Sequence, residues 1–278
     1  MKPDSDKYNG KHDNDAHLNG EDHEHEHNGN NHHHKYVNVD PLSPAYRESL
    51  IETPERHDAI REGNIALLCI DLQYLDAARG HGVFADETTA GVPKAAQEYY
   101  FSMLEKVVLP NVRRLQDAFR EHDLEVIHIR IQSLTQDGRD RSMGHKRLGL
   151  HAAPGSKEAQ ILEEVKPVGD EMVISKTSSG VFASTNIYYV LRNLDIDSLF
   201  ICGVYTDECV STTIRDAADY GFLVTLISDG CATVTQERHE FTQATLKDRY
   251  TRIMSADEAI DEITRITANH VNSSSPSQ

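Results

Sequence analysis

Short apolar runs that alternate with helix-period segments are the strongest constraint on the fold of this 278-residue chain. Apolar runs without polar alternation are typical of strands covered on both faces, and strands separated by helices form parallel sheets with right-handed crossovers. The alternation predicts an α/β domain with three layers, αβα, around a six-stranded, mostly parallel, Rossmann-like sheet. The expected strands are residues 65–70, 124–131, 172–175, 199–202, 222–227 and 252–254, and the expected helices are residues 94–122 (kinked or broken at Pro110), 183–193, 208–220, 236–247 and 256–268.

The segment 199–220 combines an expected strand, a tight turn at Gly203 and an expected helix. Cys209 falls in the first turn of that helix, where unpaired N–H groups and the helix dipole favour a thiolate, so we expect its pKa to be lowered. The same N–H groups could hold the oxyanion of a tetrahedral intermediate. A small buried hydrophobic residue is an equally common role for an unpaired cysteine. This segment alone leaves both roles open.

Two more polar residues follow buried strands. Asp71 comes directly after the strand 65–70, and Lys176 follows the strand 172–175. Because the carboxyl ends of parallel strands meet at one edge of a sheet, where open α/β folds bind ligands, these residues and Cys209 can converge. Taken alone, Asp71 could simply end a strand or cap a helix. The joint placement of all three residues favours a site.

Composition limits the kinds of protein that this chain can be. A formal net charge of −17 argues against nucleic acid as a partner, since phosphate binding needs clustered Lys and Arg. None of the apolar runs approaches the roughly 18 residues that span a membrane, and the N-terminus does not resemble a signal peptide. The four cysteines show no paired spacing and indicate reduced thiols. These features predict a soluble, cytoplasmic protein.

The chain divides into four parts by composition. Residues 1–35 are rich in His, Asn, Asp and Glu and too polar to fold alone, so we expect a disordered leader. Its imidazoles could bind metal loosely, although no structured ligand spacing is present. Residues 36–64, with three prolines, are expected to form an arm packed on the domain or on a neighbouring subunit. Residues 65–268 form the predicted catalytic domain, and residues 269–278 a Ser-rich disordered tail.

Two long irregular segments are expected near the carboxyl edge of the sheet. Residues 74–93 contain three glycines, and residues 132–156 form an excursion long enough to be a binding lid. That excursion has four basic residues that could hold a carboxylate-bearing substrate. They could equally be ordinary surface charge on a solvated lid, which we favour slightly. The four are Arg139, Arg141, Lys146 and Arg147.

Four sequence motifs resemble the isochorismatase-like cysteine hydrolases, in the order in which that family has them. They are ALLCIDLQ at residues 66–73, ISK with SGVF at 174–182, CGVYTDECV at 202–210 and LISDGCA at 226–232. The resemblance covers residues 62–262 and implies the isochorismatase-like hydrolase fold with a catalytic triad of Asp71, Lys176 and Cys209. It also implies a cis peptide between Val204 and Tyr205, and an oxyanion hole formed by the N–H groups of Tyr205 and Cys209.

The branch of the family follows from what the motifs lack. An Asp-x-His signature, which nicotinamidases of this type have in a loop near the catalytic edge, is missing here, and a nucleophilic Cys209 is unusual for true isochorismatases. The resemblance therefore implies a metal-free amidohydrolase without cofactors that acts on small carbamoyl or ureido compounds such as biuret, ureidoacrylate or N-carbamoyl amino acids, with release of ammonia. Candidate substrate-binding residues are Gln73, Thr233 and Gln236.

Other functions stay open from the sequence. A nicotinamidase or isochorismatase type of hydrolase is one alternative, and a non-catalytic binding protein with a metal-binding His-rich leader is another. Members of the family are commonly oligomers, so we expect a homo-oligomer, either a tetramer or a dimer. The partners expected are thus a small-molecule amide and other copies of the chain, with no nucleic acid and no membrane.

Overall fold

The computed structural model describes residues 40–85 and 91–273 of the chain. The predicted disordered leader at residues 1–35 lies outside the described residues. The predicted tail is described only in part, because α11 (Ala256–Ser273) continues past the expected end at Ala268. None of the helices within 40–85 and 91–273 is both long and apolar enough to cross a membrane.

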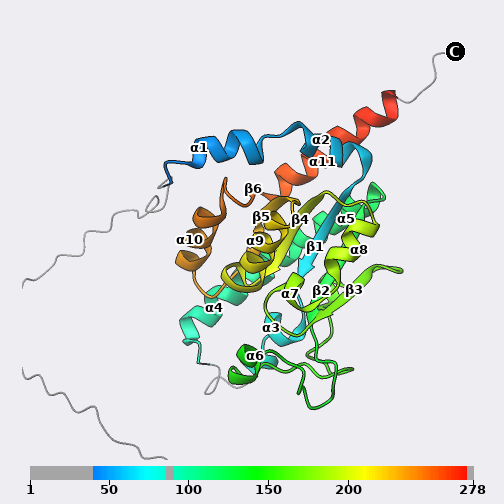
Figure 1. Cartoon of the computed structure of the whole chain (residues 1–278). Helices are drawn as coiled ribbons and strands as arrows, with labels where there is room; N and C mark the ends of the chain where they lie inside the picture. Colours follow the sequence, from blue (N-terminus) through cyan, green and yellow to red (C-terminus); the bar gives the residue numbers. More distant parts are fainter. Residues whose placement is uncertain (1–39, 86–90, 274–278) are drawn as a thin grey trace, which may run out of the picture. The chain divides into compact units, whose positions relative to one another are not determined.

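One six-stranded sheet, with every strand pair parallel, forms the centre of the domain in the order β3-β2-β1-β4-β5-β6 (Figure 1). The predicted α/β fold is confirmed, and the sheet is wholly parallel where the sequence indicated a mostly parallel one. The strands are β1 (Ile65–Ile70), β2 (Glu125–Ile131), β3 (Met172–Lys176), β4 (Ser198–Val204), β5 (Leu223–Ala232) and β6 (Arg252–Met254).

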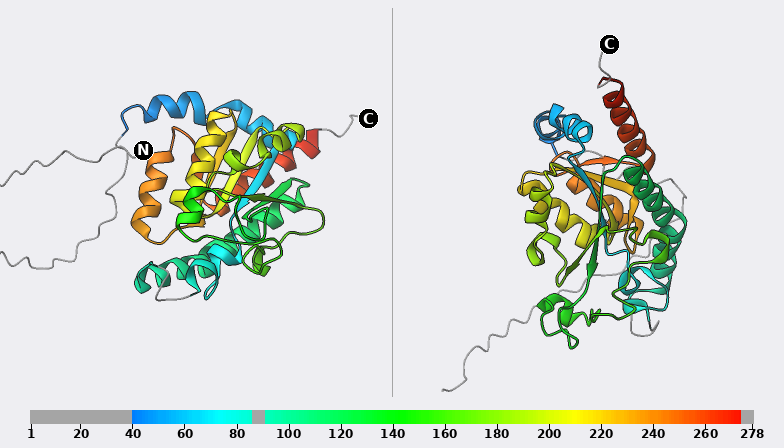
Figure 2. Two further views of the ribbon diagram at one scale, coloured as in Figure 1. Left: turned by 60° about the horizontal axis from the view of Figure 1, so that its bottom comes forward. Right: turned by 90° about the vertical axis from the view of Figure 1, so that its right-hand side faces the viewer.

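Helices cover both faces of this sheet, which makes the three layers that the sequence predicts (Figure 2). On one face lie α4 (Lys94–Met103), α5 (Leu109–Glu121) and α11, and on the other lie α7 (Val181–Ser184), α8 (Ile187–Asn193) and α9 (Ser211–Asp219). Every residue of β1 and β4 is buried between the layers, as expected for apolar runs in a parallel sheet. The remaining described segments are the helices α1 (Ser43–Tyr46), α2 (Pro54–Glu62), α3 (Tyr74–Ala77), α6 (Met143–Arg147) and α10 (Gln236–Leu246), the π segments η1 (Arg47–Ile51), η3 (Leu104–Val108) and η5 (Thr206–Val210), and the 3₁₀ turns η2 (Gly82–Phe84) and η4 (Glu163–Val165).

Pro110 does not break the helix that the sequence predicted over residues 94–122. Pro110 lies in the first turn of α5, directly after the π segment η3, so residues 94–121 form one continuous helical stretch. A proline lacks an N–H and crowds the carbonyl of the preceding turn, and the wider π turn accommodates both effects.

The arm at residues 36–64 is helical where it is described, because Pro44 and Pro54 occupy first-turn positions that suit proline. It packs on the domain through Arg56, which is buried and donates to Val224 O and Thr225 Oγ1. Ser43 adds a 2.5 Å hydrogen bond to Asp248 Oδ2. The alternative in which the arm exchanges between subunits stays a prediction.

Gly203 allows β4 to approach the end of β1 closely enough to build the site. Its φ is 122°, and a Cβ atom at this position would lie 2.0 Å from the carbonyl oxygen of Ile70. The carbonyl oxygen of Ile70 belongs to the backbone and cannot move aside as a flexible side chain can. A side chain at position 203 would therefore push apart the strand ends that hold Asp71 and Cys209.

We expect Gly203→Ala to lower the free energy of unfolding by about 3 kcal/mol or more, because it combines a strained φ with a backbone clash. Urea unfolding followed by circular dichroism measures this loss. Gly155→Ala is the matched control, since Gly155 also has a positive φ, 79°, but has no atom within 4 Å of the added Cβ. That control should cost only about 1 kcal/mol. Equal losses in the two variants would contradict the close approach at Gly203.

Candidate active site

The three residues that the sequence placed at strand ends converge at the carboxyl edge of the sheet. Asp71 follows β1, Lys176 is the last residue of β3, and Cys209 lies in η5, just after β4. Lys176 Nζ is 2.9 Å from Asp71 Oδ2 and 3.3 Å from Cys209 Sγ. Strand β2 separates β1 from β3, so it takes the long lysine side chain to bridge the gap. The predicted convergence is thus present in the structure.

Lys176 is fully buried, and its ammonium group has three acceptors. Besides Asp71 and Cys209, Nζ donates to Ser178 O at 3.0 Å. Burial disfavours the charged form, but the carboxylate of Asp71 and the sulfur of Cys209 outweigh it and raise the pKa of Lys176 above its usual value. The lysine therefore stays positively charged across the physiological pH range.

Asp71 is also fully buried, and its backbone has an unusual conformation. Its φ is 52°, in the left-handed region that non-glycine residues seldom adopt, which turns the chain sharply at the end of β1. Apart from Lys176 and the thiol of Cys209, its carboxylate oxygens have no side-chain partner among the described residues. Burial raises the pKa of Asp71, while Lys176 acts in the opposite direction. The carboxylate is therefore a stronger base than an exposed aspartate and has room to accept a proton.

Cys209 differs from the sequence expectation in its pKa. It lies in a first helical turn, as predicted, but that turn is π-helical and the side chain is 5% exposed. Burial raises the pKa of the thiol well above its usual value, and the Asp71 carboxylate adds to this against the opposing effect of Lys176. The expected lowering of the pKa is wrong, because burial removes the hydration that a thiolate needs. In the resting site the sulfur keeps its proton.

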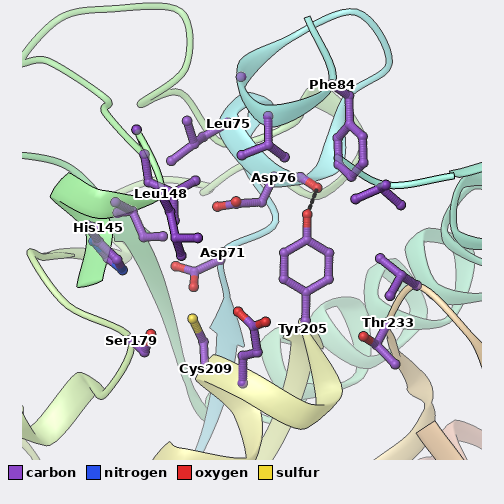
Figure 3. A pocket seen from close by; sticks show the side chains of 18 of the residues that line it. Asp71, Leu75, Asp76, Phe84, His145, Leu148, Ser179, Tyr205, Cys209 and Thr233 are labelled. Carbon is purple, nitrogen blue, oxygen red and sulfur yellow. Dashed lines mark hydrogen bonds between the residues drawn. The ribbon is translucent and has the colours of Figure 1, made fainter. Parts of the chain in front are cut away.

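A cavity of about 480 Å³ opens above Cys209 (Figure 3). This volume fits a small molecule. The figure shows the side chains of Asp71, Asp76 and Tyr205 reaching toward the space above the sulfur. The polar lining includes Asp71, Asp76, His145, Glu208 and Thr233, and the apolar lining includes Leu75, Phe84 and Leu148.

Only one of the three predicted substrate-binding residues reaches this cavity. Thr233 lines it, and its hydroxyl donates to Asp207 Oδ1 at 2.6 Å. Gln73 does not line it, because its side chain is buried and joined to the backbone of Ile131 and Glu158. Gln236 is exposed on α10, where it donates to Glu240. The positions of both glutamines argue against the predicted substrate contacts.

The four basic residues of the excursion 132–156 do not line the cavity either. Arg139 pairs with Asp137 on the surface, and Arg141 donates to the backbone oxygens of Gly138 and Leu150. Lys146 donates to the carbonyl of Arg139. These contacts stabilise the excursion itself. They agree with ordinary surface charge on a solvated lid rather than with a carboxylate-binding role.

The peptide bond between Val204 and Tyr205 is cis, as the resemblance implied. The Tyr205 side chain turns toward the cavity, and its hydroxyl donates to Asp76 O at 3.1 Å (Figure 3). Tyr100 donates to the same carbonyl oxygen at 2.8 Å. Two tyrosines thus fix the backbone at Asp76.

Two buried residues of the cavity were missed by the sequence analysis. Asp76 is 3% exposed, and its Oδ2 atom has no hydrogen-bond partner. His145 is also 3% exposed, and burial, together with Lys176 and Arg141, lowers its pKa to about 4. Both lie in segments without periodicity, so no pattern indicated which way their side chains point. The one sequence feature that could have pointed to Asp76 is that an acidic residue stands five positions after Asp71.

Metal binding has no support in the part of the chain that the structure describes. Within residues 40–85 and 91–273 no group of three His, Cys, Asp or Glu side chains is placed to hold a metal ion. All four cysteines are free thiols, as the sequence indicated.

Comparisons with known proteins point to one family. Residues 66–258 match the Isochorismatase domain. The isochorismatase family protein YrdC of Bacillus subtilis is 29% identical over 163 residues, which cover 55% of this chain and 81% of that protein. Nicotinamidase 3 of Arabidopsis thaliana is 26% identical over 162 residues, which cover 57% of this chain and 80% of that protein.

Solved structures show the same fold. A cysteine hydrolase from Pseudomonas syringae superimposes with a TM-score of 0.62 at 21% identity, covering 78% of this chain and 98% of that one. N-carbamoylsarcosine amidase from Thermoplasma acidophilum superimposes with a TM-score of 0.52 at 18% identity, covering 69% of this chain and 96% of that one.

Alkylation of Cys209 should reveal its raised pKa. At pH 7 the sulfur is protonated, so iodoacetamide should label Cys209 slowly, and the rate should still rise at pH values where an ordinary thiol is already ionised. Asp71→Asn removes the carboxylate that raises the thiol pKa and leaves Lys176 unopposed. A fall of one pKa unit would increase labelling at pH 7 about tenfold.

Mass spectrometry of the labelled peptides measures these rates. The other three cysteines are at most 2% exposed and should not react in the folded protein, and Cys209→Ser is the control for labelling elsewhere. Fast labelling of the wild type at pH 7, together with slower labelling of Asp71→Asn, would contradict the assignment of a protonated thiol.

Proposed function

The chain belongs to the isochorismatase family of hydrolases, and from this membership we propose that it is a cysteine-dependent amidohydrolase. It cleaves a C–N bond of a small carbamoyl or ureido amide through a thioester intermediate and releases ammonia. The observation that carries this proposal is the position of Lys176 Nζ, 2.9 Å from Asp71 Oδ2 and 3.3 Å from Cys209 Sγ beneath a cavity. A thiol with a carboxylate base and a fixed cation is an arrangement that can perform acyl transfer.

Attack by the thiol is the first half of the reaction. As the sulfur bonds to the substrate carbonyl carbon, its proton passes to the Asp71 carboxylate, whose raised pKa suits it to this task. The carbonyl oxygen becomes negative and is held by the backbone N–H groups of Tyr205 and Cys209. The protonated Asp71 then gives its proton to the leaving nitrogen, the C–N bond breaks, and ammonia departs from a thioester on Cys209.

Hydrolysis of the thioester is the second half. Asp71, again a carboxylate, takes a proton from a water molecule while the water oxygen attacks the thioester carbon. The C–S bond breaks, and Asp71 returns its proton to the sulfur. Lys176 remains an ammonium throughout and stabilises whichever neighbour is negative, because its raised pKa prevents it from donating its proton.

The relatives support amide cleavage and define the nearest alternative. One structural neighbour is an N-carbamoylsarcosine amidase, and one sequence relative is a nicotinamidase. A nicotinamide-cleaving activity is therefore the second candidate, favoured by that relative and disfavoured by the missing Asp-x-His signature. The homo-oligomer and the cytoplasmic setting stay predictions.

Ammonia release from a panel of amides tests the proposal. We expect turnover of at least one of biuret, ureidoacrylate-like ureido acids, N-carbamoyl amino acids and nicotinamide. In Cys209→Ser the weaker nucleophile should reduce turnover by at least about 1,000-fold. Each reaction is run with and without EDTA, and release should be insensitive to the chelator.

Ser211→Ala is a suitable control, because the Ser211 hydroxyl donates to Glu208 O and the residue does not line the cavity. It should retain activity close to that of the wild type. Unchanged turnover in Cys209→Ser, or no turnover of any amide by a folded wild type, would overturn the proposed function.

A further inference from the structure

Acidic side chains dominate the charged lining of the cavity. Asp71, Asp76 and Glu208 all contribute to it. Of the arginines and lysines in the described part of the chain, only Arg238 lines the cavity, and its guanidinium group is paired with Asp207 through two nitrogens. Lys176 is occupied by Asp71, Cys209 and Ser178. A negatively charged ligand would therefore find carboxyl groups but no uncommitted arginine or lysine among the described residues.

Asp76, like His145 and His151, lines the cavity with an unpaired buried polar atom that the proposed reaction does not use, and it is the only carboxyl group of the three. Its side chain is buried, and Oδ2 has no hydrogen-bond partner in the protein. Buried polar atoms are nearly always satisfied, so an unpaired one that faces a cavity is available to a bound ligand. The tyrosine hydroxyls of Tyr100 and Tyr205 hold the Asp76 backbone by its carbonyl oxygen. The carboxyl group is thus presented to the cavity from a fixed backbone (Figure 3).

We propose that Asp76 determines substrate specificity by accepting a hydrogen bond from an N–H group at the end of the substrate away from the bond that is cleaved. The substrate class is then an uncharged urea or amide whose distal group is itself a carbamoyl or amide group. Compounds with a carboxylate at that end are rejected. This inference rests on the proposed amidohydrolase function and narrows its substrates.

The chemistry of a buried carboxyl group favours this class in either protonation state. As a carboxylate, Asp76 accepts N–H donors at both oxygens, and as a carboxylic acid it offers one acceptor and one donor, which match the N–H and C=O of a primary amide. A substrate carboxylate has no N–H to offer and brings a like charge next to Asp71 and Glu208. Sites that hydrogen-bond one polar group discriminate strongly against a partner that leaves that group unpaired.

A matched pair of ligands tests the specificity. N-carbamoylglycinamide ends in an amide and N-carbamoylglycine ends in a carboxylate, and the two have nearly the same size and shape. Their dissociation constants are measured by calorimetry at pH 7.5 in the Cys209→Ser variant, which cannot turn them over by the proposed route. We expect the amide to bind at least tenfold more tightly than the carboxylate.

Substitution of Asp76 should change the ratio of the dissociation constants of the carboxylate and the amide. Asp76→Asn in the Cys209→Ser background keeps the side-chain size but removes the charge and supplies an N–H donor that suits a carboxylate. The amide-to-carboxylate preference should therefore fall at least tenfold. Asp137→Asn is the control, because Asp137 is an exposed carboxylate that does not line the cavity, and it should leave the ratio unchanged within twofold.

The inference is overturned if the carboxylate binds as tightly as the amide, if neither ligand binds, or if Asp76→Asn leaves the ratio unchanged. Ammonia release by the wild type separates this failure from failure of the proposed function. Cysteine-dependent release without the expected selectivity would overturn the role of Asp76 alone. Selective binding without release from any amide would overturn the hydrolase mechanism and leave Asp76 as a ligand-binding residue.

Discussion

The buried ammonium group of Lys176 is the interaction on which the site depends. A charge removed from water is costly unless it is paired, and removal of one partner leaves the other uncompensated. Here the charge is satisfied by Asp71, Cys209 and Ser178, which lie beyond the ends of three different strands. The parallel sheet brings those ends together, and the lysine then fixes the distance between the base and the nucleophile.

Burial also explains why the thiol rests in its protonated form. The apolar layers that stabilise the sheet exclude water from Cys209, and the raised pKa of the thiol is the consequence. A protonated sulfur needs a base at the moment of attack, and Asp71 is close by with a raised pKa of its own. The same burial that disfavours a free thiolate also raises the pKa of the Asp71 carboxyl group, which makes it a better acceptor for the thiol proton.

Much of the fold could be predicted because it depends on repeating patterns. The bounds of β1 and β6 match the sequence prediction, and alternation of strands and helices gave the parallel sheet. The helices of the arm could not be predicted from its prolines alone, because Pro54, a residue type that often ends a helix, begins one here. Asp71, Lys176 and Cys209 were found because strand ends mark them. Asp76 and His145 lie in the short helices α3 and α6, whose sequences have no apolar periodicity that would indicate the direction of a side chain.

The central claim is that the substrate acyl group becomes bonded to Cys209, and its most direct test is to trap that intermediate. The enzyme is mixed with an amide that it turns over, quenched in acid, digested, and examined by mass spectrometry. The account predicts a mass increase equal to the acyl group on the peptide that contains Cys209, removed by neutral hydroxylamine as a thioester would be. An acyl group on any other residue, with Cys209 unmodified during turnover, would contradict it.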